Sequence, residues 1–134
     1  MSKELIKRDF KLFLETYIPE LKDKVKSAFP QVTSLTTPLA IIEIPASTSR
    51  QTIQSGISRT TKYRRLVRLY MVDDSPKKIE QRVDVFCQKY NDNISFFTKC
   101  HPFSISFISD PQPLYEEKYN LYVSRIDINV IEFI

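Results

Sequence analysis

The side chains of this chain that could support catalysis or bind a metal ion are few and scattered. His101 is the only histidine, and it lies between Cys100 and Pro102. A catalytic triad or a zinc site needs several such groups, and the second cysteine, Cys87, lacks the C-x-x-C spacing of a metal or redox motif. We interpret both cysteines as reduced, partly buried thiols and His101 as a surface or packing residue.

The carboxylates and the glycine give no stronger sign of an active site. Asp73–Asp74 is followed directly by Ser75–Pro76, which favours a role as negative charge at the N-terminus of a helix. Glu116–Glu117 lies in an expected loop, where acidic side chains are solvated. Loops that cradle phosphate groups are rich in glycine, and Gly56 is the only glycine of the chain. We therefore expect a protein that is not an enzyme and that uses no cofactor and no metal ion.

Length and composition are those of one ordinary globular domain. The chain has 134 residues, of which 42% are hydrophobic and 27% are charged. No apolar run approaches the ~20 residues that span a membrane, and the N-terminus "MSKELIKRDF" has charges where a signal peptide needs an apolar stretch. We expect a single domain over residues 1–134 that is made in a cytoplasm and has no membrane partner.

Positive charge is concentrated in one segment. Residues 46–72 carry six basic side chains and no acidic one, although the net charge of the whole chain is only +4. Within this segment, "ASTSRQTIQSGISRTTK" at 46–62 is also rich in serine and threonine. A compact domain rarely keeps so long a polar connection without a use for it. The charge and the polarity together predict an interaction surface rather than a reaction site.

Two helices are expected to support this segment. Apolar residues recur at helical spacing from residue 3 to Tyr17, and the stripe continues to Phe29, which predicts one helix broken near Ile18 or two short helices in succession. In the second region, Ser75 suits an N-cap and Pro76 the first helical position. The apolar stripe that follows them predicts a helix that ends at 91–93.

Strands are expected on both sides of the polar segment. "PLAIIEIP" at 38–45 and "KYRRLVRLYMV" at 62–72 have strand character, as do 94–97, 103–109 and the C-terminal "YNLYVSRIDINVIEFI". In the strand at 62–72 neither set of alternating side chains is purely polar. We expect a helix to cover one face of it and a neighbouring subunit to cover the other. The fold class that follows is α+β, with a mostly antiparallel sheet, both helices packed on one face, and a long polar β-arm or loop at about 46–62.

In the order and length of these elements, the chain resembles the tail terminator and tail-completion (head-tail joining) proteins of long-tailed bacteriophages. The resemblance rests on the helix "LIKRDFKLFLETY", the strand "PLAIIEIP", the polar arm, the strand "YRRLVRLYMV", the helix "SPKKIEQRVDVFCQKY" and the closing strand "SRIDINVIEF". It covers nearly the whole chain but includes no diagnostic motif. The serine- and threonine-rich arm departs from the family, so its contacts are not carried over.

The resemblance implies a structural protein of the virion, in the tail or neck, that assembles in the cytoplasm of the host. Six copies would form a closed ring, in which each subunit uses two different patches. One face of the ring would bind the tail tube protein and stop its polymerisation. The other face would receive a head-tail connector or neck protein, and DNA would pass through the lumen without specific binding.

The residues themselves add a hypothesis about the partner interface. We expect the arm to reach a neighbouring subunit or the tube, and the basic strand after it to present positive charge to acidic partner surfaces. Ile53 and Ile57 are the large apolar side chains of the arm and its candidate anchors. The predicted interface residues are Arg50, Ile53, Gly56, Ile57 and Arg59 in the arm, and Lys62, Arg64, Arg65, Arg68 and Tyr70 in the basic strand.

Two alternatives remain open at this level. A head-tail connector or neck protein of the same viruses would have similar size and elements. A small nucleic-acid-binding protein could use the basic residues of the 50–68 segment to follow a phosphate backbone, with Tyr63 and Tyr70 stacking on bases. Acidic side chains outnumber basic ones in the rest of the chain, which argues mildly against this second alternative.

Overall fold

The computed structural model of the chain describes residues 3–28, 36–45, 48–55, 58–93, 96, 103–106 and 112–133. Side chains are described at 4–28, 36–45, 65–93, 96 and 112–130. The elements, in chain order, are α1 (Lys3–Tyr17), the 3-10 turn η1 (Pro19–Leu21), β1 (Val25–Lys26), β2 (Leu39–Glu43), β3 (Thr48–Ser55), β4 (Ser58–Asp73), α2 (Pro76–Asp92), β5 (Phe103–Ser106), β6 (Leu114–Glu116) and β7 (Leu121–Phe133).

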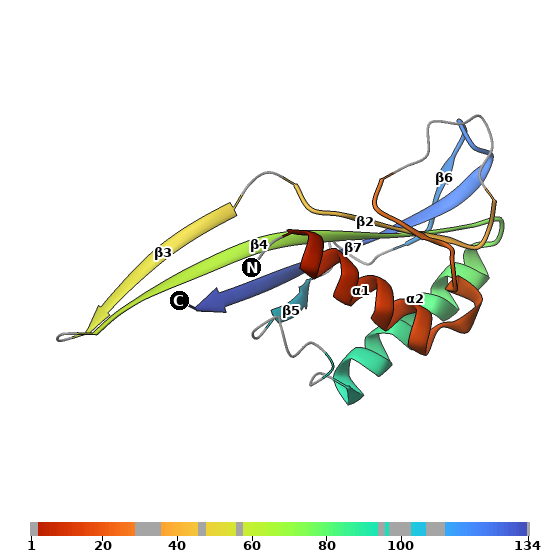
Figure 1. Ribbon diagram of the computed structural model, residues 1–134. Coiled ribbons are helices and arrows are strands. Elements are labelled where there is room, and N and C mark those ends of the chain that lie inside the picture. Colours follow the sequence, from red (N-terminus) through yellow and green to blue (C-terminus); the bar gives the residue numbers. More distant parts are fainter. Residues whose placement is uncertain are drawn as a thin grey trace.

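The sheet is built around one long antiparallel pair, β4 and β7. These strands are in register from Lys62 opposite Phe133 to Asp73 opposite Tyr122. On the edge of β4 that faces away from β7, β3 pairs with the first part of β4 and β2 with the last part. On the edge of β7 that faces away from β4, β6 pairs with the first part of β7 and β5 with a later part. The short β1 joins β2 in parallel, while the other pairings are antiparallel. Figure 1 shows α1 and α2 on the same side of this sheet, and the β3–β4 hairpin extending beyond it.

The main core lies between the two helices and the sheet. Every second residue of the central strands points into it, as the two-residue period of a strand requires. The helices contribute the apolar stripes that their sequences predict. The core comprises Ile6, Phe10, Phe13 and Leu14 of α1, Ile79, Val83, Phe86 and Tyr90 of α2, and Val67, Leu69, Met71, Ile126, Ile128 and Val130 of the central strands, with further residues around them.

A second, smaller apolar cluster lies on the helix-free face of the sheet. Leu39, Ile41, Val72 and Leu121 are buried there, and Tyr70, Tyr119 and Val123 pack against them. Both faces of β4 are therefore covered in part, as its mixed alternation predicts. On the helix-free face, residues of the chain itself provide this cover near β6.

The predicted fold class is confirmed. The structure has an N-terminal helix, a second helix and a mostly antiparallel sheet. α2 begins at Pro76 with Ser75 in the N-cap position, although the side chain of Ser75 makes no capping hydrogen bond. The described part of 46–62 is an antiparallel hairpin, so the polar segment is a β-arm rather than an irregular loop.

The prediction of helix up to Phe29 is wrong beyond Tyr17. Pro19 starts only the single turn η1, and the next residues form a turn in which Asp23 has a φ of 61°. A non-glycine residue in this left-handed region is incompatible with continuation of a helix. Val25 and Lys26 then pair with β2 instead. Of the strand predicted at 94–97, Phe96 alone is described, and it packs against Phe13 and Tyr17 rather than in a sheet.

Candidate interaction surface

Only part of the β3–β4 hairpin protrudes from the sheet. Its base is held on both sides, because residues Lys62–Arg65 of β4 pair with β3 on one edge and with β7 on the other. Among the described residues the pairing with β7 extends to Lys62, and Thr52–Ser55 opposite Ser58–Thr61 continues as a two-stranded ribbon. A hairpin of two strands has little stability of its own in water. The two-stranded ribbon of Thr52–Ser55 and Ser58–Thr61 is therefore the part of the arm that an outside contact would stabilise most.

The described arm residues of the predicted interface occupy defined backbone positions along the β3–β4 hairpin. Arg50 is opposite Tyr63, Ile53 is opposite Thr60, and Arg59 is opposite Gln54, while Gly56 and the candidate anchor Ile57 lie outside the described residues. Lys62 and Arg64 lie in the three-stranded base. The strand pairing thus places Arg50, Ile53 and Arg59 in one hairpin.

The remaining predicted residues divide between the two faces of β4. Arg65 alternates with Val67 and lies on the helix side, whereas Arg68 and Tyr70 lie on the helix-free face. Glu43 of β2 and Asp127 of β7 are the direct register neighbours of Arg68. Such opposite charges on adjacent strands attract each other. Arg68 is consequently part of a mixed charged row and not of a purely positive surface.

Tyr70 lies beside this row on the same face, opposite Ile41 and Arg125, and is engaged within the chain. Burial raises the pKa of its hydroxyl, and a hydrogen bond to Glu43 and the charge of Glu43 raise it further, while Arg125 acts in the opposite direction. Arg125 also approaches the buried Asp127, with Nε at 3.4 Å from Oδ1. Because Glu43 and Arg125 engage the hydroxyl of Tyr70, a partner could contact only the exposed part of its ring.

Exposed apolar side chains gather instead on β6. All three residues of β6 are exposed, and Leu114 and Tyr115 are 71% and 51% exposed. The ring of Tyr115 packs edge-on against Tyr122 at 5.3 Å, and its hydroxyl is hydrogen-bonded to Asn120. Exposed tyrosine held in place by its own chain is typical of interfaces, because little side-chain entropy is lost on binding.

The acidic pair at the end of β4 has a different role from the one predicted. Asp73 is 2% exposed and forms an ion pair with Arg82 of α2, which also lies 3.8 Å from Glu20. Asp74, by contrast, is exposed and pairs with Lys78 at 3.4 Å. Asp73 is thus a buried structural anchor that ties the sheet to α2, and only Asp74 matches the expected charge near a helix N-terminus.

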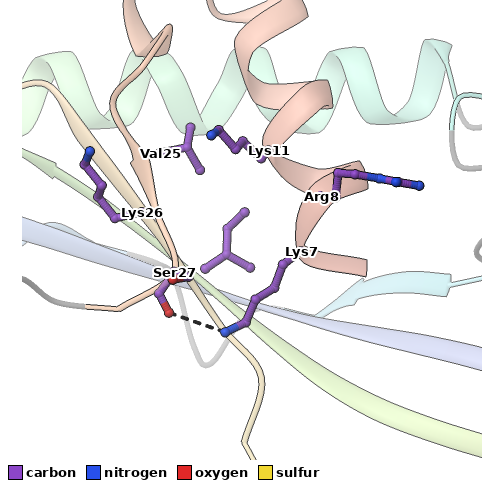
Figure 2. Close-up of a pocket in the computed structure, with 7 residues that line it drawn as sticks. Lys7, Arg8, Lys11, Val25, Lys26 and Ser27 are labelled. Atoms are coloured by element: carbon purple, nitrogen blue, oxygen red, sulfur yellow. Dashed lines mark hydrogen bonds between the residues drawn. The ribbon is translucent and has the colours of Figure 1, made fainter. Parts of the chain in front are cut away.

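A basic groove that the sequence did not indicate lies between α1 and β1. It has a volume of about 360 Å³ and a floor formed by the buried side chains of Val25 and Ile42. Figure 2 shows Lys7 and Lys11 extending from α1 toward β1, and Lys26 on the side of β1 with its amino group pointing away from α1. In the sequence the lysines of this groove are scattered. They come together only because Val25 and Lys26 form the strand β1, and the sequence predicts a helix there.

Cys87, on α2, fits the predicted reduced and partly buried thiol. Burial raises its pKa, and the charge of Asp84 adds to this effect, so the sulfur stays protonated and unreactive near neutral pH. Cys100 and His101 lie outside the described residues. In the described part of the chain, no group of three or more histidine, cysteine or acidic side chains is placed to hold a metal ion.

No protein-family model matches the chain, and neither does any curated protein. Within the described residues, none of the helices is long and apolar enough to cross a membrane.

Proposed function

We propose that this chain is a structural virion subunit of the phage tail terminator kind. Copies of it form a ring that caps the tail tube, stops its polymerisation and offers a surface for attachment of the head. The observation that carries this proposal is the β3–β4 hairpin, whose tip continues past the end of β7 without a third strand among the described residues.

The hairpin suits a contact between subunits. A closed ring needs two different patches on each subunit, one to reach out and one to receive. The tip of the arm fits the first role, because binding would supply the support that two strands lack. The arm contributes Arg50 in its three-stranded base and Arg59 in its two-stranded ribbon, and it has no acid, so the contact favours an acidic receiving surface.

The exposed side chains of β6 fit the receiving role. Leu114 and Tyr115 offer apolar area, and Glu116 and Glu117 beside them are exposed carboxylates. β6 borders β7 and the arm borders β4, so the two patches lie on opposite edges of the central strand pair. That placement allows one copy to contact the next in a head-to-tail direction.

The mass of the purified protein in solution, together with negative-stain images, tests the proposal. We expect a hexamer that appears as a ring with an open centre, and we expect this ring to stop the growth of tail tube protein in a mixture. A neck protein would also form rings but would leave tube growth unchanged. A single chain that neither forms rings nor caps tubes would contradict the proposal, and salt-sensitive DNA binding by that single chain would favour the nucleic-acid alternative.

Removal of the tip of the arm should abolish ring formation without unfolding the body. Gln51 and Lys62 are register partners, so an Asn-Gly turn in place of residues 52–61 closes the hairpin in the same register. We expect an unchanged circular dichroism signal per folded residue and a shift of the mass to that of one chain. Rings of normal mass that cap tubes normally would show that the tip is not the subunit contact.

A variant that lacks two arm charges measures how much electrostatic attraction contributes to the contact between subunits. We expect the double variant Arg50→Gln, Arg59→Gln to form rings at low salt only, because ionic strength screens whatever attraction remains. The matched control removes two charges from α2 instead, with Lys77→Gln and Lys89→Gln, and should assemble as the wild type does.

A further inference from the structure

The groove between α1 and β1 is lined by cations from two elements and by no acid. Its lining consists of Lys7, Arg8, Lys11, Val25, Lys26, Ser27 and Ile42. Another hollow in the described part of the chain, about 560 Å³ between η1 and α2, has a mixed lining in which Glu20 and Asp84 accompany Lys78 and Arg82. Only the first of these two hollows therefore selects for a negatively charged occupant.

The positions of the lysines are ordered by the fold. Lys7 and Lys11 are one turn apart on the same face of α1, and the Nζ of Lys7 donates a hydrogen bond to the carbonyl oxygen of Ser27 at 3.4 Å. Lys26 lies on β1, which is fixed by its pairing with Ala40 and Ile41 of β2. In Figure 2 Arg8 points away from β1, and the amino group of Lys26 points away from α1, so Lys7 and Lys11 reach across the groove while Lys26 borders it on the side of β1.

These three lysines are poorly neutralised within the described part of the chain. Like charges at the i and i+4 positions of a helix repel each other and destabilise it slightly. The nearest carboxylate to Lys11 in an ion pair is that of Glu15, at 4.0 Å, which is the outer limit for such a pair. A bound anion would relieve this repulsion, and the apolar floor of Val25 and Ile42 would strengthen its attraction by excluding water on one side.

We propose that this groove binds the phosphate groups of a nucleic-acid backbone. Three clustered cations call for a ligand with several charges, and a single carboxylate would neutralise only one of them. A nucleic-acid strand carries one negative charge for about every 3.4 Å of its axis. Lys7 and Lys11 are separated by about 6 Å along α1, so they match charges repeated along such a strand. Because the lining has no aromatic side chain, the contact is to the backbone and is independent of base sequence.

This site goes beyond the proposed ring and does not depend on it. Weak contacts with phosphates would be compatible with passage of DNA, whereas the arm and β6 would hold the subunits together. The two proposals fail separately, because ring formation is measured by mass and phosphate binding by titration with an oligonucleotide.

Fluorescence anisotropy with labelled single-stranded DNA of 20 nucleotides tests the groove. We expect the full-length protein to bind, with log K falling linearly as log salt rises. The triple variant Lys7→Gln, Lys11→Gln, Lys26→Gln should bind roughly tenfold more weakly at 50 mM salt, and its salt slope should be smaller by about 2, since each lost phosphate contact removes about 0.7. Two oligonucleotides of different sequence should be affected equally.

The matched control removes the same charge from α2, with Lys77→Gln, Lys78→Gln and Lys89→Gln. Its binding should stay within twofold of that of the wild type, and both triple variants should keep the wild-type mass and circular dichroism. Competition with inorganic tripolyphosphate distinguishes the source of the phosphate, and we expect the oligonucleotide to bind more tightly. No DNA binding by the wild type, equal weakening in the control variant, or tighter binding of tripolyphosphate would each overturn the proposal.

Discussion

Replacement of Asp73 by asparagine should lower the free energy of unfolding by roughly 3 kcal/mol, the lower end of the range for breaking a buried ion pair. The side chain of Asp73 is 3% exposed and that of Arg82 is 12% exposed. Asparagine removes the negative charge and leaves the guanidinium with Glu20 at 3.8 Å as its remaining acidic partner. Because Arg82 keeps some contact with water and with Glu20, we expect the lower rather than the upper part of that range. Urea unfolding of the two proteins at pH 7 measures the difference.

The pH dependence of this difference identifies its cause. Burial alone would raise the pKa of Asp73, but hydrogen bonds from Arg82 and from Asp74, together with the charge of Arg82, lower it below 3.8. A carboxyl group with a lowered pKa stabilises the folded state above its ordinary pKa, and this contribution is lost as the pH falls through the lowered value. The two proteins should therefore differ most near neutral pH and converge below about pH 4.

Asp74 provides the control for this experiment. Its carboxylate is 62% exposed and contacts Lys78 at 3.4 Å, so Asp74→Asn should cost about 0.5 kcal/mol. A loss at Asp73 no larger than that at Asp74, or one that is the same at pH 3 and pH 7, would show that the Asp73–Arg82 pair does not anchor α2 to the sheet.

The sequence predicts the elements whose signals are local. Ser75–Pro76 and the apolar stripe after them place α2, and the alternation at 62–72 separates the two faces of β4 correctly. The polar segment 46–62 is recognised as an arm because its composition differs from that of the strands beside it. In each case one stretch of residues carries the information, and neighbouring elements do not reverse it.

The features that the sequence does not predict depend on residues far apart along the chain. Val25 and Lys26 have helix-like spacing with the residues before them, and only pairing with Ala40 and Ile41 makes them a strand. The sequence does not predict the groove beside β1 either, because that groove forms only when β1 pairs with β2. Asp73 resembles a helix-terminal charge until the approach of Arg82, nine residues later, buries it. Local propensity is overridden by tertiary contact in all three places.

The candidate interface shows the same division. Sequence reasoning selects the arm, and strand pairing brings its residues into one ribbon. It does not anticipate that Arg68 would lie between Glu43 and Asp127, because the register of three strands decides those neighbours. Nor does it select Leu114, whose exposure is apparent only once β6 is placed at the edge of β7.

Truncation of Phe13 to alanine should cost about 3–5 kcal/mol, because it removes one of the large buried side chains that join α1 to the rest of the core. Phe13 is 1% exposed, and its ring lies edge-on to those of Phe86 and Phe96, at 5.7 and 5.3 Å. The cavity left behind borders both helices, and each lost aromatic contact adds about 0.5–1.5 kcal/mol at most to the loss of buried area. In guanidinium unfolding, we expect the midpoint to fall while the slope stays constant.

The adjacent residue on α1 provides the control, since Leu12 is 55% exposed and Leu12→Ala should change stability by no more than about 0.5 kcal/mol. Alanine favours a helix at least as well as leucine does, so neither variant should suffer from a loss of helix propensity. Equal losses in the two variants would mean that α1 is not held through Phe13. Lys7 and Lys11 lie on the same helix, and a loosened α1 would move them away from Lys26. Phe13→Ala should therefore also weaken binding of the oligonucleotide under conditions in which the protein remains folded, whereas Leu12→Ala should not.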